Sequence, residues 1–301
     1  MKKRFLRRPR RLLTYCLIRI IIATFDLLPR WLGSRISGLA GAACYYLFSN
    51  SRKVAIANLK AVYGGTLSEA KIKEIARRSF SNLGRFAFDL IKVQSRGMDY
   101  LRKITTVSGK ENLDRALSKK RGVIALTGHV GNWELLAAYF SMLGYKVNVV
   151  ASPLRDKRLN KLVNKMRTRV GLKVVDRSKG VLSAVRCLRR GEIVGVLIDQ
   201  DTSVESVIVD FLGIPAKTAI GPVWLARQTG AVVVPLAMLM GENGNYRIEV
   251  KKPVELNDDP SSIEEGVERC SREVEEFIRR DPSQWVWMHK RWKSVLAELY
   301  N

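Results

Sequence analysis

A histidine and a glutamate lie close together in a glycine-containing segment of this 301-residue chain. Residues 127–134 read T-G-H-V-G-N-W-E and directly follow an apolar run, 123–126. In one continuous helix His129 and Glu134 would diverge by about 140°, because they are five residues apart. They can meet only if His129 lies in a strand-to-helix turn and Glu134 in the first turn of the helix. Glu134 would then hold one ring nitrogen and leave the other free to accept a proton, so we predict His129 and Glu134 as catalytic residues.

The residues around this pair favour a strand–turn–helix geometry. Gly128 and Gly131 permit unusual backbone angles, and Asn132 is a good N-cap for a helix that begins at the next residue. Backbone amides near Gly131 are candidate oxyanion donors, and we assign Gly131 and Asn132 to substrate binding. A lone histidine is more often structural than catalytic. The chain contains only two, however, and one of them falls in this turn.

Several other chemistries lack their motifs. No G-x-S-x-G elbow is present, which argues against a serine hydrolase. Two histidines and four scattered cysteines make a zinc site improbable, and the cysteine spacing suits a reducing compartment. Residues 213–218 lack the second glycine of a phosphate-binding loop, and no G-x-G-x-x-G follows a strand. We therefore expect no metal site, and nucleotide and dinucleotide use lack support.

The charge and the N-terminus point toward anionic partners. Lysine and arginine exceed acidic residues by 53 to 28, while 47% hydrophobic residues suffice for a core. This surplus favours nucleic acid, an anionic membrane or an acidic protein, although a generic basic surface is the simpler reading. Seven basic residues lie within 1–11, and a mostly apolar run follows over 12–28. Arg19 and Asp26 interrupt that run on one side of a helix, so it is amphipathic as readily as membrane-spanning.

We expect residues 1–48 to form a basic tail and membrane-anchoring helices, and 49–301 to form a cytoplasmic α/β domain. A cleavage site of small residues is not evident, so we do not expect a removable signal peptide. By the positive-inside rule, the basic end stays in the cytoplasm. The second run, 31–48, contains Gly33, Gly38 and Gly41. It is expected to pack on the first run or to dip into the membrane interface. The alternative is that both runs are ordinary buried helices.

Beyond residue 50 the pattern is that of an α/β fold. Thr66 and Glu69 have capping-box spacing and predict a helix over 69–93. Apolar runs predict strands at 123–126, 146–151, 173–175, 192–198, 231–239 and 246–250, with helices near 132–143, 154–170, 178–190 and 218–229. This alternation predicts a mixed, largely parallel central sheet flanked by helices, with an N-terminal membrane-associated helix.

Five motifs, in this order along the chain, resemble one family. They are R-x-x-A-x-x-N-L at Arg52, Ala55, Asn58 and Leu59, HVGNWE, DQD at 199–201, the stretch 209–235, and PSQWVWMHKRWK at 282–293. Together they resemble the lipid A biosynthesis acyltransferases, the lauroyl and myristoyl transferases of Gram-negative bacteria, over roughly residues 15 to 295. That family belongs to the wider glycerolipid-type acyltransferases with an H-x4-D/E motif.

The resemblance implies an acyl carrier protein thioester as donor, a phosphorylated glycolipid hydroxyl as acceptor, and no cofactor. His129 would deprotonate the acceptor and Glu134 would orient it, without an acyl-enzyme. The resemblance also maps a functional arginine to Arg167, with Arg169 as a close rival, and an acidic residue to Asp199. Arg167 would grip a sugar phosphate, and Asp199 would bind hydroxyls or hold that arginine. The alternative without a functional role is that Arg167 is a solvated helix arginine and that Asp199 caps a turn.

The implied location is the cytoplasmic face of a bacterial inner membrane, where one basic face could meet the carrier protein, the acceptor and the anionic lipid. One alternative is a related acyltransferase acting on another glycolipid or phospholipid. A second is a non-enzymatic basic protein that binds membrane or nucleic acid. No nucleic-acid motif is present, so no nucleic-acid partner is expected. Near the C-terminus, Trp285 is expected to pack on the sheet and His289 to be structural, while Trp287 and Trp292 either pack or form an interfacial patch.

Overall fold

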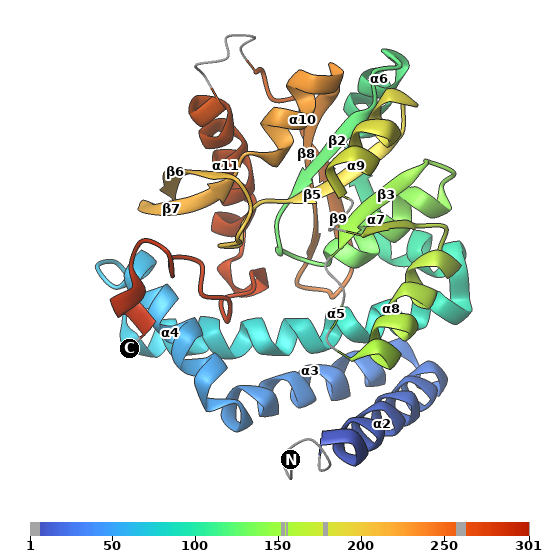
Figure 1. The fold of residues 1–301 in the computed structure, drawn as a ribbon. Helices are drawn as coiled ribbons and strands as arrows, with labels where there is room; N and C mark the ends of the chain where they lie inside the picture. The colour runs from blue at the N-terminus through green and yellow to red at the C-terminus, as the bar shows by residue number, and fades with distance from the viewer. Residues whose placement is uncertain (1–6, 152–153, 155, 177–179, 257–262, 301) are drawn as a thin grey trace.

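A computed structural model describes residues 7–151, 154, 156–176, 180–256 and 263–300 and shows an α/β fold (Figure 1). The central sheet has seven strands in the order β1-β9-β8-β2-β5-β3-β4. Five neighbouring strands, from β8 to β4, are parallel, and β9 pairs antiparallel with β8 and parallel with β1. The strands are β1 (Thr105–Ser108), β2 (Val123–Thr127), β3 (Val147–Ala151), β4 (Lys173–Asp176), β5 (Ile193–Leu197), β8 (Val232–Met240) and β9 (Tyr246–Val250). The predicted mixed, largely parallel sheet is confirmed.

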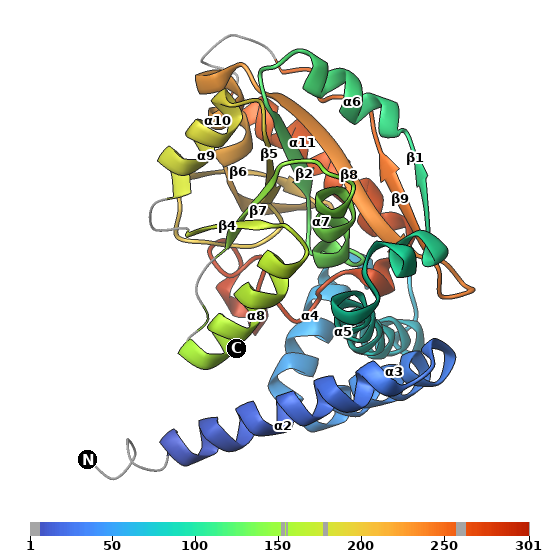
Figure 2. The same cartoon turned by 90° about the vertical axis from the view of Figure 1, so that its right-hand side faces the viewer.

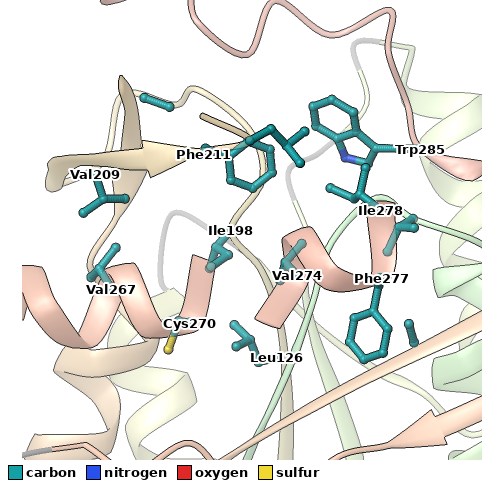
Figure 3. Close-up of a cluster of buried hydrophobic side chains, with 14 of the residues drawn as sticks. Leu126, Ile198, Val209, Phe211, Val267, Cys270, Val274, Phe277, Ile278 and Trp285 are labelled. Atoms are coloured by element: carbon teal, nitrogen blue, oxygen red, sulfur yellow. The ribbon is translucent and has the colours of Figure 1, made fainter. Parts of the chain in front are cut away.

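Helices cover both faces of this sheet (Figure 2). Alternate residues of β2 face opposite ways, with Val123 in one buried cluster and Ile124 and Leu126 in the other. The Val123 side packs against α6 (Lys110–Ser118), α7 (Trp133–Met142) and the later part of α5 (Glu69–Ile104). The Leu126 side packs against α9 (Gly180–Arg189), α10 (Gly221–Thr229) and α11 (Ile263–Arg280). In Figure 3, Leu126, Ile198 and Trp285 meet side chains of α11 in this second core.

All six predicted strands are present, and the four predicted helices correspond to α7, α8 (Lys157–Arg169), α9 and α10. The prediction omitted β1, the helix at 49–63, α6, α11 and a separate antiparallel hairpin formed by β6 (Ser206–Phe211) and β7 (Ile214–Ala219). The expected capping box at Thr66 is wrong, because its hydroxyl donates to Tyr63 O while Ser68 caps α5 through Lys71 N. The helix also continues beyond residue 93, with a break at Gly97.

Two helices precede this domain core, α2 (Arg7–Leu27) and α3 (Arg30–Leu47). The main partner of α3 is α5, rather than the first helix as expected. Glycine makes this close approach possible, since a Cβ at Gly41 would lie 2.3 Å from Phe80 O and one at Gly84 would lie 2.1 Å from Ser37 O. Across the described residues, no helix reaches the combination of length and hydropathy that a bilayer span requires. The basic tail at 1–6 lies outside the described residues.

Candidate active site

The turn between β2 and α7 has the predicted strand–turn–helix geometry. α7 begins at Trp133, and the Asn132 side chain caps it by accepting a hydrogen bond from Leu135 N at 3.2 Å. Gly131 has a φ of +59°, and a Cβ there would lie 2.0 Å from Met238 O. The turn therefore requires glycine at this position for both conformation and space. His129 lies in this turn, two residues beyond the end of the strand.

Asp199 holds the His129 imidazole. Asp199 follows β5, the parallel neighbour of β2, so the two strands deliver both residues to the same edge of the sheet. His129 Nδ1 lies 2.8 Å from Asp199 Oδ1, and the His129 backbone N–H donates to Asp199 Oδ2 at 2.5 Å. The Asp199 side chain is 1% exposed and the His129 side chain 23%. The carboxylate is thus buried behind an imidazole that remains accessible.

The surroundings keep Asp199 ionised. Burial acts to raise its pKa, but the charge of His129 and the N–H donors around the carboxylate lower the pKa to about 2. One of those donors is Trp285 Nε1, 2.7 Å from Oδ2. An ionised carboxylate only accepts hydrogen bonds, so His129 donates through Nδ1–H, and in the neutral ring this leaves the lone pair on Nε2. This is the tautomer that a general base needs.

Two further side chains contact the imidazole. Gln200 Nε2 lies 3.2 Å from His129 Nε2 and is its hydrogen-bond donor in this tautomer. The ring of Trp133 meets the imidazole edge-on, with centroids 5.1 Å apart. Any other group that bonds to Nε2 must therefore replace the Gln200 amide.

Glu134 is not placed as expected. Its carboxylate binds Arg167 through both oxygens, with Arg167 Nε 3.0 Å from Oε2 and Arg167 Nη2 bonded to Oε1. Among the described residues no bond joins Glu134 to His129, because Asp199 and Gln200 occupy both ring nitrogens. The expected His–Glu contact is therefore replaced by a His129–Asp199 contact. The expectation that Asp199 holds the arginine is also wrong, since Glu134 does so.

The same contact distinguishes the positions of the two candidate arginines. Arg167 lies on the inner side of α8 and reaches Glu134 on α7, and both side chains are about one-fifth exposed, at 19% and 23%. Arg169 is exposed on the outer side of the same helix. A cavity of about 40 Å³ adjoins this ion pair, lined by Leu90, Glu134, Val163, Met166, Arg167, Val170 and Leu172. The Glu134–Arg167 ion pair thus lies beside a small, mostly apolar cavity.

The expectation that Gly131 and Asn132 bind substrate does not fit their contacts. The Gly131 N–H donates to Gln284 O at 2.9 Å, and the Asn132 N–H donates to Met238 O at 2.9 Å. The Asn132 side chain is 3% exposed and also donates to Phe86 O at 3.2 Å. These groups support the turn. Both backbone amides already donate to carbonyl oxygens in this conformation, so neither is free to bind an oxyanion.

A buried hydrogen-bond network continues from Asn132. Its Nδ2 lies 3.4 Å from the Tyr246 hydroxyl, which donates to Asp89 Oδ2 at 2.8 Å. Asp89 is 1% exposed and also accepts from the Tyr100 hydroxyl and from Arg30 at the start of α3. Burial and the negative charge of Asp89 raise the pKa of both tyrosines, which therefore remain neutral donors. The turn that contains His129 is thereby tied through α5 to α3.

The C-terminal segment closes the other side of the turn. Val286 N donates to His129 O at 3.2 Å, and Gln284 O accepts from Gly131. Trp285 packs against the sheet as predicted and also bonds to Asp199, a role the sequence did not indicate. Trp287 and Trp292 are completely buried, so the interfacial-patch alternative is wrong for both.

Asn58, on α4 (Ser49–Tyr63), fastens this segment in place. Its amide donates to the carbonyls of Trp287 and His289 at 2.8 and 2.7 Å. Burial lowers the pKa of His289, and its Nδ1 has no partner among the described residues. The early R-x-x-A-x-x-N-L motif thus acts on the site from a distance through the C-terminal segment.

The sequence has relatives among characterised families. The family model for bacterial lipid A biosynthesis acyltransferases matches residues 1–294. The chain belongs to this family. It is 26% identical over 223 residues to a lipid A biosynthesis acyltransferase of Haemophilus influenzae, covering 73% of this chain and 69% of that one. It is 28% identical over 192 residues to the lipid A biosynthesis lauroyltransferase of Escherichia coli, covering 63% and 62%.

A relative named for a different acceptor is similar to a comparable degree. The phosphatidylinositol mannoside acyltransferase of Mycobacterium tuberculosis is 25% identical over 199 residues, covering 64% of this chain and 61% of that protein. The matches to this protein and to the lauroyltransferase span less than two thirds of their lengths. Within the lipid A acyltransferase family, the chain is an acyltransferase. The identity of the acceptor is a separate question.

Proposed function

We propose that this protein transfers a fatty acyl chain from an acyl carrier protein thioester to a hydroxyl of a phosphorylated lipid A precursor. One observation carries the proposal: His129 presents Nε2 on its accessible side while buried, ionised Asp199 fixes Nδ1–H. The His–Glu pair that the sequence favoured is replaced in this proposal by His129 and Asp199. Glu134 remains part of the site as the partner of Arg167.

The proposed reaction needs no acyl-enzyme. The acceptor hydroxyl gives its proton to His129 Nε2 as its oxygen attacks the thioester carbon. The C–S bond then breaks, and the leaving sulfur takes the proton from the imidazolium to become a thiol. Asp199 stabilises the positive charge that develops on the imidazole between these two transfers. No metal or cofactor takes part in this scheme, and the described residues contain no cluster of potential metal ligands.

Arg167 is the proposed phosphate-binding residue of the acceptor site. Its guanidinium is oriented by two bonds to Glu134 and keeps further N–H donors for an anion. Through Glu134 it is bonded to α7, the helix that begins four residues after His129. This arrangement suits an acceptor with a phosphate near the reacting hydroxyl.

We also propose that residues 1–48 associate with the membrane and that residues 49–301 carry out acyl transfer at the cytoplasmic face of the inner membrane. Figures 1 and 2 show α2 and α3 together at one end of the molecule. Most of the exposed large apolar side chains belong to them or to the residue after α3, namely Leu17, Ile20, Ile21, Leu27, Trp31, Ile36, Leu39, Tyr46, Leu47 and Phe48. Exposed Arg19 and Arg35 lie among these residues and would meet anionic headgroups.

The membrane proposal has a direct test with a matched control. Leu39 and Leu47 are 71% and 76% exposed on α3, whereas Ile208 is 57% exposed on the distant hairpin. We expect Leu39→Glu with Leu47→Glu to abolish sedimentation with phosphatidylglycerol vesicles and Ile208→Glu to leave it unchanged. Equal sedimentation of all three proteins would refute membrane association through α3.

The catalytic proposal is tested by acyl transfer with purified protein. The assay uses a panel of acyl carrier protein thioesters and a Kdo-bearing lipid A precursor, with His129→Ala compared with His289→Ala as the second histidine of the chain. We expect His129→Ala to abolish transfer while its melting temperature is retained, and His289→Ala to remain active. Activity of His129→Ala at the wild-type level would exclude the mechanism.

A second acceptor class remains a candidate because the mannoside acyltransferase and the lipid A relatives have similar identities to this chain. Transfer to a mannosyl phospholipid but not to the lipid A precursor would assign the protein to that class. The non-enzymatic alternative is disfavoured by the family match and by the accessible His129–Asp199 pair.

A further inference from the structure

The helix that positions Arg167 carries a row of unpaired positive charge on its other side. Lys157, Lys161, Lys165 and Arg169 recur every fourth residue along α8, and all four are exposed. Side chains four residues apart are neighbours on a helix, so they form one continuous ridge. We call these four residues the α8 ridge.

The α8 ridge has no ionic partner in the described part of the chain. The residues of α8 include six basic and no acidic ones, and the ion pair on its outer side joins Arg158 to the N-cap Asp156 instead. Like charges at this spacing repel, and the first turn of the helix contains lysine and arginine where a carboxylate would suit the helix dipole. The repulsion among these four cations therefore destabilises α8. An external partner with negative charge would relieve that repulsion.

The opposite side of α8 faces the active site. Arg167 is turned by about 200° from Lys165, and it bonds to Glu134 while Val163 and Met166 line the neighbouring cavity. A partner bound along the ridge would thus lie one helix diameter from the site, about 10 Å. That position suits a partner that delivers a substrate.

We infer that the α8 ridge is the docking surface for an acidic protein that carries the acyl thioester, an inference that rests on the proposed function. A row of four cations complements a helix or loop rich in carboxylates, and such rim charges mainly steer association. Bilayer insertion is disfavoured for this surface, because an interfacial helix needs large apolar side chains on its inserted face. Within the described residues α8 has no exposed large hydrophobic side chain, in contrast to α2 and α3.

The test compares two donors with the same acyl chain. One is the thioester of purified acyl carrier protein, and the other is the N-acetylcysteamine thioester, which is small and uncharged. The acceptor is supplied in neutral detergent so that no anionic bilayer is present. The variant is Lys161→Glu with Lys165→Glu, and the control is Lys119→Glu with Lys252→Glu, which makes the same charge change at two other exposed lysines.

We expect the ridge variant to raise the KM for the carrier-protein donor by about tenfold, with kcat unchanged and the small donor unaffected. Lys161→Gln with Lys165→Gln should give an intermediate rise, and the control should match the wild type. The wild-type KM for the carrier donor should also rise from about 50 mM to about 300 mM salt, and the rise should be weaker in the ridge variant.

Three results would overturn the inference. The first is an unchanged KM for the carrier-protein donor in the ridge variant. The second is an equal change for both donors, which would mean that the ridge acts through the site itself. The third is a normal KM together with lost binding to phosphatidylglycerol vesicles, which would assign the ridge to an anionic bilayer. A wild-type protein that transfers from neither donor would refute the proposed function, which distinguishes that failure from the others.

Discussion

Asp199 and Glu134, the two carboxylates of the candidate site, differ in burial, in position and in partner. Asp199 is 1% exposed, lies at the end of a central strand and receives hydrogen bonds from His129 and Trp285. Glu134 is 23% exposed, lies in the first turn of α7 and binds Arg167 on a neighbouring helix. The first carboxylate is fully buried at the edge of the sheet, whereas the second is half-buried in an ion pair between two helices. In the proposed mechanism the first carboxylate sets the tautomer of His129 and the second orients the arginine that binds the acceptor.

The largest expected effect follows from neutralising the buried carboxylate. In Asp199→Asn the amide can donate to His129 Nδ1, which places the ring proton on Nε2 and removes the lone pair needed for catalysis. We expect kcat to fall by about 10³- to 10⁴-fold with little change in either KM. Transfer assays with both substrates at saturation measure this. A fall of less than about tenfold would show that Asp199 does not govern the base.

Asp199 should also account for part of the loss of folding stability at acidic pH. The pKa of Asp199 is lowered from 3.8 to about 2 in the folded protein, so its ionised form favours folding. This contribution is fully present above about pH 4 and is lost as the pH falls through the folded pKa, and it amounts to roughly 2 kcal/mol. Urea unfolding between pH 2 and pH 5 should show it as a difference in slope between wild type and Asp199→Asn. Parallel curves would contradict the predicted linkage.

Breaking the ion pair between Glu134 and Arg167 should affect the acceptor KM rather than kcat, and by a smaller factor. Glu134→Gln leaves Arg167 without its ionic partner, and we expect the acceptor KM to rise about tenfold while kcat changes little. Arg167→Ala should produce the same change, and the double variant should be no worse than either single one. Steady-state kinetics with varied acceptor measure these values. If Glu134→Gln reduced kcat as strongly as Asp199→Asn does, Glu134 would be the orienting residue in the reactive conformation.

Gln200 gives the smallest expected change. Its amide occupies His129 Nε2 in the absence of substrate, and a neutral hydrogen bond contributes modestly. In Gln200→Ala we expect kcat/KM for the acceptor to increase by about two- to threefold. Competition between two acceptors in one reaction would resolve a change of this size. A large decrease would instead give the amide a role in binding the reacting groups.

Local features of the fold were predictable from the sequence. The β2–α7 turn was identified because Asn132 has the side chain of an N-cap and the glycines allow the turn. Short apolar runs marked every strand of the sheet except β1. Residues 206–219, which form the β6–β7 hairpin, mix polar and apolar side chains and include Pro215, so that no clear strand pattern results.

The partners in the site were not predictable because they depend on strand order. His129 and Asp199 are 70 residues apart, and their contact requires β2 and β5 to be neighbours. Trp285 lies a further 86 residues along the chain, and only the folded C-terminal segment brings its indole to the carboxylate. A five-residue spacing made Glu134 the nearer candidate in sequence, but it gave no information on the competing arginine of α8. The family resemblance pointed to Asp199 and Arg167, while the contacts that each one makes could be seen only in the folded structure.

The hydrogen bonds between residues 282–292 and the turn of His129 can form only late in synthesis of the chain. On a ribosome the turn emerges about 150 residues before the segment that supplies Gln284, Trp285 and Val286. Until that segment arrives, Gly131 N, His129 O and one Asp199 oxygen lack the partners they have in the folded protein. The site is therefore assembled last, and a nascent chain that has already formed most of its sheet still lacks a finished active site.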